Sequence, residues 1–257
     1  MVDGIRVEVE DREDGRVATV TVDYQAKLNI LGRARTERLR DAFLGLASDE
    51  ELRAVVLTGA GERAFIGGAD IREMVELEPA SARSFITTLH EACQSIRDLP
   101  VPVIARIDGY CLGAGLEAAA ACDLRVATDR SSFGMPEVRV GLPSVIEAVL
   151  LPSLVGWGRT RELVYTGENW DAREAQEAGL LERVVSPDAL DSSVQRWLTS
   201  ILANGSRAIR AQKRLVTQWE QLSIEDSIAL SIDMFEATFE DSEPHDAMQQ
   251  FINRPRG

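Results

Sequence analysis

Cysteine, histidine and long hydrophobic runs are scarce in this sequence of 257 residues. The three cysteines (Cys93, Cys111 and Cys122) form no closely spaced pair and lie in apolar or helical contexts, which is typical of reduced, buried thiols. The two histidines are too few for a metal cluster and too far apart in the sequence for a serine or cysteine triad. We therefore expect no metal site.

Positive charge is also in deficit. Lysine and arginine number 28 against 42 acidic residues, which gives a formal net charge of −14. Such a charge repels nucleic acid and anionic membrane surfaces, so neither is an expected partner. The first residues lack a basic-then-apolar signal, and no apolar run reaches the length of about 18 residues that a membrane span needs. These absences favour a soluble cytoplasmic protein, and 45% hydrophobic residues suffice for a full core.

Two glutamates beside tight turns are the main chemical signal in the sequence. Residues 109–117 (GYCLGAGLE) place a glycine on each side of Ala114 and end at Glu117, where an alanine-rich helix begins. The first N–H groups of a helix have no partner within it, so the Ala114 N–H can stabilise an oxygen that gains negative charge. Glu117 follows three residues later on the same helix face. From this segment alone, glycines that only permit close packing and a solvated Glu117 are an equally good interpretation.

A second candidate donor lies in residues 64–74 (AFIGGADIREM), after an apolar, β-branched run. The two glycines predict a strand-to-helix turn from which the N–H of Ala69 projects much as that of Ala114 does. Asp70 and Glu73 are spaced as a helix capping pair, so we interpret Asp70 as an N-cap rather than as a catalytic acid. Two converging N–H donors are what an oxyanion hole requires.

Four segments in order carry a family resemblance: residues 65–74 (FIGGADIREM), 107–117 (IDGYCLGAGLE), 122–127 (CDLRVA) and 133–138 (FGMPEV). They resemble successive signatures of the crotonase superfamily, the enoyl-CoA hydratase/isomerase group. The resemblance covers nearly the whole chain and implies an α/β fold, a spiral of ββα units. It also implies a CoA thioester substrate, with its carbonyl oxygen between the N–H groups of Ala69 and Ala114, and no cofactor beyond the CoA that the substrate carries.

The resemblance assigns the chemistry to Glu117 and Glu137, because two glutamates at these positions act on one water molecule in the hydratases of the family. Water addition to a 2-enoyl-CoA needs hydroxide character at the β carbon and a proton at the α carbon. Two carboxyls close together in an apolar pocket repel, so one holds a proton while the other is ionised. Which glutamate is the acid and which the base stays open at this point.

The leading hypothesis is therefore an enoyl-CoA hydratase that makes a 3-hydroxyacyl-CoA. An isomerase needs only a proton shuttle, and a thioester hydrolase could direct the water to the thioester carbonyl, so both remain alternatives on the same fold. A non-catalytic assembly subunit is a third alternative, but it gives two acids and two donor turns no chemical purpose.

The stretch after Glu137 departs from the family pattern, which has a glycine cluster there. Ser144 stands where a glycine N–H often orients the water, and Val145 and Ile146 are bulkier than glycine, so we expect a reshaped water and acyl pocket. Glu147 adds a third acid, which we interpret as a first-turn helix residue favoured by the helix dipole. Nearer the N-terminus, Lys27 resembles the family segment that touches the CoA nucleotide and is a candidate phosphate contact.

The pattern of the chain changes near residue 195. Up to that point strand and helix signals alternate, and beyond it helical periodicity dominates. We therefore divide the chain into a catalytic spiral core, residues 1–195, and a helical C-terminal region, residues 196–257. The resemblance implies that this region packs in a homotrimer, often paired into a homohexamer, and its apolar residues Phe235, Phe239 and Phe251 suit such a face, although an intramolecular core explains them nearly as well.

The hydrophobic periodicity also predicts individual elements of the core. The expected strands are residues 7–9, 17–22, 54–57, 103–107 and 124–127, and the expected helices are residues 36–47, 81–99 and 117–121.

Overall fold

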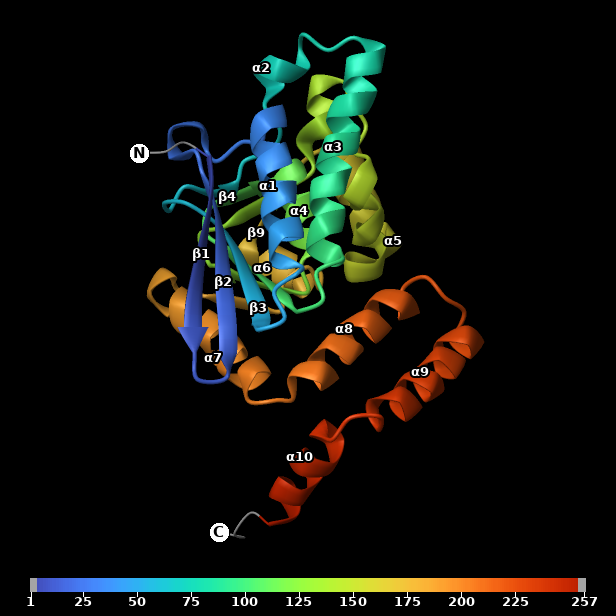
Figure 1. Cartoon of the computed structure of the whole chain (residues 1–257). Coiled ribbons are helices and arrows are strands. Elements are labelled where there is room, and N and C mark those ends of the chain that lie inside the picture. The colour runs from blue at the N-terminus through green and yellow to red at the C-terminus, as the bar shows by residue number, and fades with distance from the viewer. Residues whose placement is uncertain (1–3, 254–257) are drawn as a thin grey trace.

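The structure is a computed structural model that describes residues 4–253 of the chain. Two β-sheets and a set of helices form the body of the molecule, and the last helices extend away from it (Figure 1). All five strands and all three core helices expected from the sequence are present, with ends that differ by a few residues.

The larger sheet has six strands in the order β1-β2-β3-β5-β7-β10. Its first two strands form an antiparallel hairpin, and every later pairing is parallel. The inner strands are apolar along most of their length because helices cover both faces of a parallel sheet. The strands are β1 (Gly4–Arg12), β2 (Gly15–Asp23), β3 (Leu52–Gly59), β5 (Val103–Ile107), β7 (Leu124–Thr128) and β10 (Arg183–Val185).

The smaller sheet has four strands in the order β4-β6-β8-β9, each three residues long. Its first three strands are parallel, and β9 closes the sheet in antiparallel orientation. The strands are β4 (Ala64–Ile66), β6 (Tyr110–Leu112), β8 (Ser132–Gly134) and β9 (Asn169–Asp171). Strands this short show no alternation in the sequence, so the periodicity that predicts the larger sheet does not predict this one.

The core helices surround a central helix, α4 (Ala114–Ala121), in which all eight residues are buried. A helix that is apolar and small on every side can lie in the middle of a fold, since it has no face that needs water. The other core elements are α1 (Arg33–Leu46), α2 (Ile71–Met74), α3 (Pro79–Arg97), α5 (Leu151–Thr166) and α6 (Ala172–Glu177), with the 3₁₀ helices η1 (Gln25–Lys27), η2 (Pro136–Val140), η3 (Ile146–Leu150) and η4 (Pro187–Ala189).

Helix α7 (Leu190–Leu202) covers the other face of the larger sheet and buries Leu190, Val194, Leu198 and Leu202 against it. Residue 195, where we placed the change to a helical region, lies in the middle of α7. The helices that leave the body begin later, after Gly205, because the apolar face of α7 up to Leu202 packs on the sheet.

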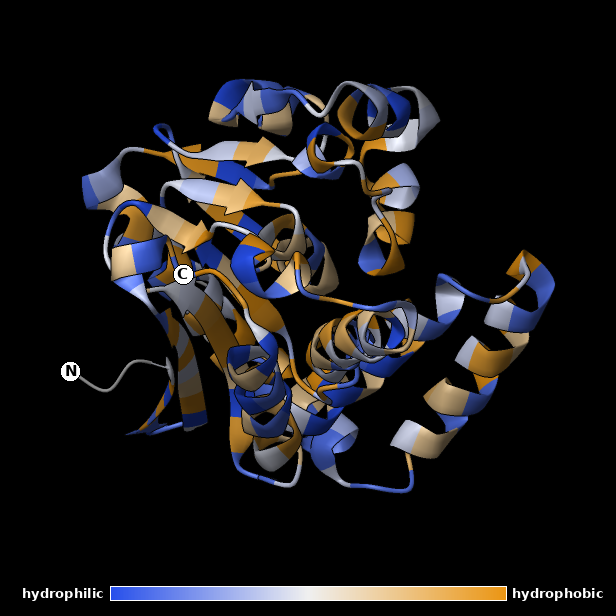
Figure 2. Ribbon diagram, turned by 90° about the horizontal axis from the view of Figure 1, so that it is seen from above, coloured by the Kyte–Doolittle hydropathy of each residue, from blue (hydrophilic) through white to orange (hydrophobic). Residues whose placement is uncertain are grey.

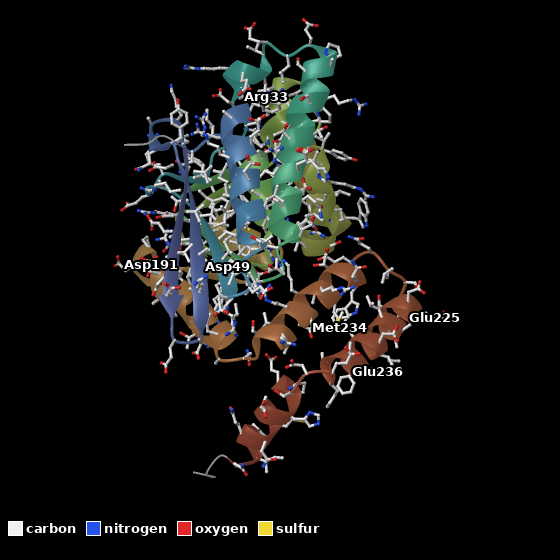
Figure 3. All side chains as sticks on the ribbon, in the orientation of Figure 1. Arg33, Asp49, Asp191, Glu225, Met234 and Glu236 are labelled. Atoms are coloured by element: carbon white, nitrogen blue, oxygen red, sulfur yellow. The ribbon has the colours of Figure 1, made fainter. Side chains whose placement is uncertain are left out.

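The C-terminal helices are α8 (Ser206–Trp219), α9 (Ile224–Thr238) and α10 (Glu243–Ile252). A buried ion pair holds α8 to the core, since Lys213 Nζ lies 2.6 Å from the Asp123 carboxylate. Neither α9 nor α10 buries a residue. Arg33, at the start of α1, lies at the opposite end of the molecule from Glu225 and Glu236 on α9 (Figure 3).

Two local expectations have definite outcomes. Asp70 is the N-cap of α2, as expected, and its carboxylate accepts the Arg72 N–H at 3.1 Å. The capping pair is wrong, because Glu73 accepts the Arg33 N–H at the start of α1 at 2.9 Å instead of reaching back to Asp70. Helix α2 has only four residues, so the more favourable dipole for this carboxylate is that of the longer helix.

Across the described part of the chain, no helix is both long enough and apolar enough to cross a membrane.

Candidate active site

The register of the smaller sheet brings the two predicted donor turns side by side. Ile66 of β4 pairs with Cys111 of the parallel neighbour β6. Ala69 follows Ile66 by three residues, and Ala114 follows Cys111 by three residues. The turns therefore leave adjacent strands at the same level, at the carboxyl edge of a parallel sheet, where ligand sites of α/β proteins form.

Gly115 makes this close approach possible. A Cβ atom added at Gly115 would collide with the carbonyl oxygen of Ile66, so any larger residue would push α4 away from the turn that carries Ala69. Gly68 has a positive φ of 118°, which only glycine adopts without strain. Gly115 is thus required by the packing of one turn against the other, and Gly68 by the backbone conformation of its own turn.

Both predicted donor N–H groups are turned away from the hydrogen bonds of the chain. Leu31 donates to the Gly68 carbonyl and accepts from the Asp70 N–H, each at 2.9 Å. Because successive N–H groups of an extended segment point to opposite sides, the N–H of Ala69 faces away from Leu31. Ala114 is the first residue of α4 and has no acceptor within the helix. Within residues 4–253 neither N–H donates to another backbone carbonyl.

Glu117 lies one helical turn after Ala114, and its residue is only 5% exposed. Burial raises its pKa well above the ordinary value, and the negative charges of Glu137 and then Glu147 raise it further. The backbone N–H of Ala148 acts in the opposite direction and lowers the pKa. This environment therefore favours the protonated form of the Glu117 carboxyl.

Glu137 comes from η2, directly after β8, the third parallel strand of the smaller sheet. One of its oxygens, Oε2, accepts a hydrogen bond from the Ser144 hydroxyl at 2.7 Å. Its other oxygen, Oε1, lies against the backbone of Gly113, where an added Cβ would collide with it. Three neighbouring strand ends therefore supply the Ala69 turn, the Ala114 turn and Glu137, and Glu117 follows on α4.

The wall formed by Ser144, Val145 and Ile146 lies at the start of η3. Ser144 contacts Glu137 through its hydroxyl. The sequence predicted a role only for the backbone N–H at this position, so the hydroxyl contact was not predicted. Ile146 has a positive φ of 43°, an uncommon conformation for a β-branched residue, and its partly buried side chain packs on the core. Val145 is 41% exposed. The family glycines are absent, yet the backbone keeps the left-handed conformation at Ile146.

Lys27 lies at the edge of this arrangement. It is exposed at the end of η1, and the next residue, Leu28, accepts the N–H of Gly67 at 2.9 Å. The backbone at Lys27 therefore lies next to a segment that contacts the turn leading to Ala69. Its role toward the phosphates of CoA stays a prediction.

Glu147 has a different environment from the one expected. It is 4% exposed, and its Oε1 lies 2.7 Å from His90 Nδ1 on α3. Glu147 does stand in the first turn of η3, as expected, but its burial and its contact with His90 were not predicted. The sequence separates His90 from Glu147 by 57 residues, so only the packing of α3 against η3 reveals the pair.

Comparisons with known proteins agree with this architecture. The sequence profile of the family described as "Enoyl-CoA hydratase/isomerase" matches residues 12–256. A short-chain-enoyl-CoA hydratase of Clostridium acetobutylicum is 33% identical over 94% of this chain and 93% of that protein. A crotonyl-CoA hydratase of Syntrophomonas wolfei is 30% identical over 94% of each chain.

Solved structures give the same result. An enoyl-CoA hydratase of Mycobacterium smegmatis superimposes with a TM-score of 0.92 at 32% identity, over 97% of this chain and 98% of that one. An enoyl-CoA hydratase of Bacillus anthracis gives a TM-score of 0.90 at 30% identity, over 95% of each chain. The fold is thus the crotonase-like α/β fold with its C-terminal helices. The chain belongs to the enoyl-CoA hydratase/isomerase family.

Proposed function

We propose that this protein is an enoyl-CoA hydratase, which adds water reversibly to a 2-enoyl-CoA and gives a 3-hydroxyacyl-CoA. One observation carries the proposal: two N–H donors without a backbone acceptor and two electrostatically coupled glutamates meet at the ends of adjacent strands. The names and identities of the relatives support the same reaction.

The reaction follows from these groups. The N–H groups of Ala69 and Ala114 hold the thioester carbonyl oxygen and stabilise the negative charge that it gains when the β carbon is attacked. Glu117 and Glu137 hold the water between them. The ionised carboxylate accepts a proton from the water as its oxygen bonds to the β carbon, and the protonated carboxyl gives its proton to the α carbon. One water is consumed, and no net proton is released.

The resting charges indicate where the proton begins. Burial and the charges of its neighbours favour the protonated form of Glu117, and the Ser144 hydroxyl donates a hydrogen bond to Glu137. We propose that Glu117 is the acid and Glu137 the base, because concerted addition of a hydroxyl and a proton requires two carboxyls in different protonation states.

The proposal is tested with purified protein and crotonyl-CoA, without nucleotide and with a chelator present, because we propose that no cofactor other than the CoA of the substrate takes part. The loss of the conjugated double bond and the appearance of the 3-hydroxyacyl product measure hydration. Release of free CoA would instead indicate a thioester hydrolase, and migration of the double bond without water uptake would indicate an isomerase.

Substitution of the glutamates tests the mechanism. Glu117→Gln and Glu137→Gln keep the shape of the side chain and remove its proton transfer, so each should lower turnover on the order of 10²-fold or more. Normal hydration by the Glu137→Gln variant would contradict the two-carboxylate mechanism.

We propose further that the exposed apolar side chains of α9 and α10 pack between copies of this chain in a homotrimer or homohexamer. The exposed fractions of Ile224 (83%), Ile232 (63%) and Phe235 (68%) support this, since large apolar side chains in one stripe favour a protein interface. The cytoplasmic location expected from the sequence stays a prediction.

A further inference from the structure

A third carboxyl lies beside the two glutamates of the proposed reaction. Glu147 of η3 is buried, and one of its oxygens, Oε2, has no hydrogen-bond partner among the described residues. Burying an unpaired carboxylate oxygen is costly, so folding alone does not account for a glutamate at this position. Its other oxygen, Oε1, contacts His90 Nδ1 at 2.7 Å.

Three elements meet at this carboxyl. Helix α3 supplies His90, α4 supplies Glu117, and η3 supplies Glu147 itself, and each of the three elements packs against the other two. Glu117 and Glu147 are near enough for the charge of one to act on the other. Burial first, and then the charges of Glu147 and Glu117, raise the pKa of the buried Cys93 thiol of α3 well above the ordinary value.

The segment that carries Glu147 also carries the contacts to both proposed catalytic residues. The Ser144 hydroxyl holds Glu137, and the Ala148 N–H acts on Glu117. Between these residues the chain passes through the positive φ of Ile146, a conformation that the surrounding contacts must maintain. The contact between Glu147 and His90 anchors this segment to α3.

We propose that Glu147 and His90 form a positioning pair, in which the His90 ring holds the buried Glu147 carboxyl where its charge acts on Glu117. This inference rests on the proposed hydration, because it concerns the residues assigned to that reaction. The pair touches neither the water nor the thioester. It acts through Glu117.

The surroundings of Glu147 determine the direction of the effect. The pKa of Glu147 is raised, chiefly by burial, and the hydrogen bond and charge of His90 counteract part of this rise, as does the charge of Arg97 on the same helix. The other ionisable groups that face the cluster are Cys93 on α3, Glu117 on α4 and Glu137 on η2. Since the His90 side chain is 47% exposed and that of Glu147 only 5%, solvent screens the histidine charge more strongly than the charge that Glu147 directs at Glu117.

The test is the pH at which Glu117 loses its proton. Glu147→Gln keeps the shape and the contact with His90 but removes the negative charge, so the pKa of Glu117 should fall on the order of one unit. The infrared band of the protonated Glu117 carboxyl, identified by its loss in the Glu117→Gln variant, should disappear at lower pH. The limb of the pH profile of kcat that Glu117 governs should move to lower pH by the same amount, while KM for crotonyl-CoA changes little.

A second variant removes His90, the exposed partner of the Glu147 carboxyl. His90→Ala removes the group that lowers the pKa of Glu147, so Glu147 stays protonated to higher pH and its charge on Glu117 diminishes. The titration of Glu117 should therefore move in the same direction as in Glu147→Gln, and the double variant should show no larger shift than Glu147→Gln alone. Independent, additive shifts would overturn the coupling through Glu147.

Glu91→Gln is the matched control. Glu91 follows His90 on α3, is exposed, and pairs with Arg40 at 2.8 Å, so its loss removes a charge of the same sign from the same helix. An unchanged Glu117 titration in Glu147→Gln, or an equal shift in Glu91→Gln, would refute the positioning pair. If the unmodified protein hydrates no enoyl-CoA, the proposed function fails, and the infrared titration still decides whether the pair controls Glu117.

Discussion

Helices α4 and α9 differ in how much of their surface is buried. All eight residues of α4 are buried, whereas α9 buries none of its 15. Small side chains let the backbone of α4 approach β4 and deliver Ala114 and Glu117 to the site. On α9 the large side chains of Ile224, Ile228 and Ile232 recur every fourth residue and form a stripe without a cover in this chain.

Figure 2 shows this contrast, since the strands of the body carry hydrophobic colour in the interior and α9 stands apart at the right of the view with hydrophobic segments along it. An apolar groove of about 300 Å³ lies between the end of α8 and the first half of α9, and Trp219, Leu222 and Ile228 are among the residues that line it. The contrast supports the proposed assembly: contacts within one chain bury α4, and contacts between copies of the chain would cover the exposed stripe of α9.

The largest effect is expected from charges placed in the stripe of α9. In the double variant Ile228→Asp, Phe235→Asp, two charges would be buried in the proposed interface without partners, which prevents association. Light scattering should find a mass near 28.2 kDa, that of one chain, where the unmodified protein gives a multiple of it. Asp233→Ala is the control, because this exposed residue lies on the other side of α9. If the unmodified protein has the mass of one chain and is fully active, the assembly proposal is wrong.

The second largest effect is expected at Gly115, where the packing of α4 is closest. Gly115→Ala places a methyl group against the Ile66 carbonyl, so the turns that carry Ala69 and Ala114 must separate. We expect a loss of about 1–3 kcal/mol in the free energy of unfolding and, because an oxyanion donor is displaced, a fall in kcat on the order of 10²-fold.

Gly45 of α1 provides the control for that change. A Cβ atom added there meets no atom within 4 Å, so Gly45→Ala should keep full activity and raise stability by about 0.5–1 kcal/mol. Thermal unfolding and crotonyl-CoA hydration measured on both variants separate packing at the site from the general effect of alanine in a helix. Equal stability and activity for the two variants would mean that a methyl group fits at position 115 without displacing α4.

The sequence predicted what local patterns encode. The long strands and helices follow hydrophobic periodicity, and the turns at Ala69 and Ala114 follow from glycine and from helix-start chemistry. The three-residue strands β4, β6 and β8 are too short for a periodic signal, yet their register is what aligns the two turns with Glu137.

The buried pair escaped prediction for a different reason. An isolated histidine on a long helix and a glutamate at the start of another element each look like solvated surface residues. Their contact depends on how α3 packs against η3 and is not encoded within either segment. The boundary near residue 195 was likewise placed from helical periodicity, which does not distinguish α7, packed on the sheet, from α9, which is not.

The smallest effect is expected at Ile146. Its side chain packs on the core, as the residues of α4 do, but its backbone has an unfavourable positive φ next to the proposed water site. Ile146→Ala removes side-chain volume while keeping the Cβ atom and therefore the cost of the positive φ. The acyl preference should change by several-fold across enoyl-CoA substrates of different length and branching, with kcat for the preferred substrate little affected. Ile146→Gly relieves the φ strain as well, so it should unfold at a higher temperature than Ile146→Ala. An equal loss of activity on every substrate in both variants would show that the residue supports the fold and does not shape the pocket.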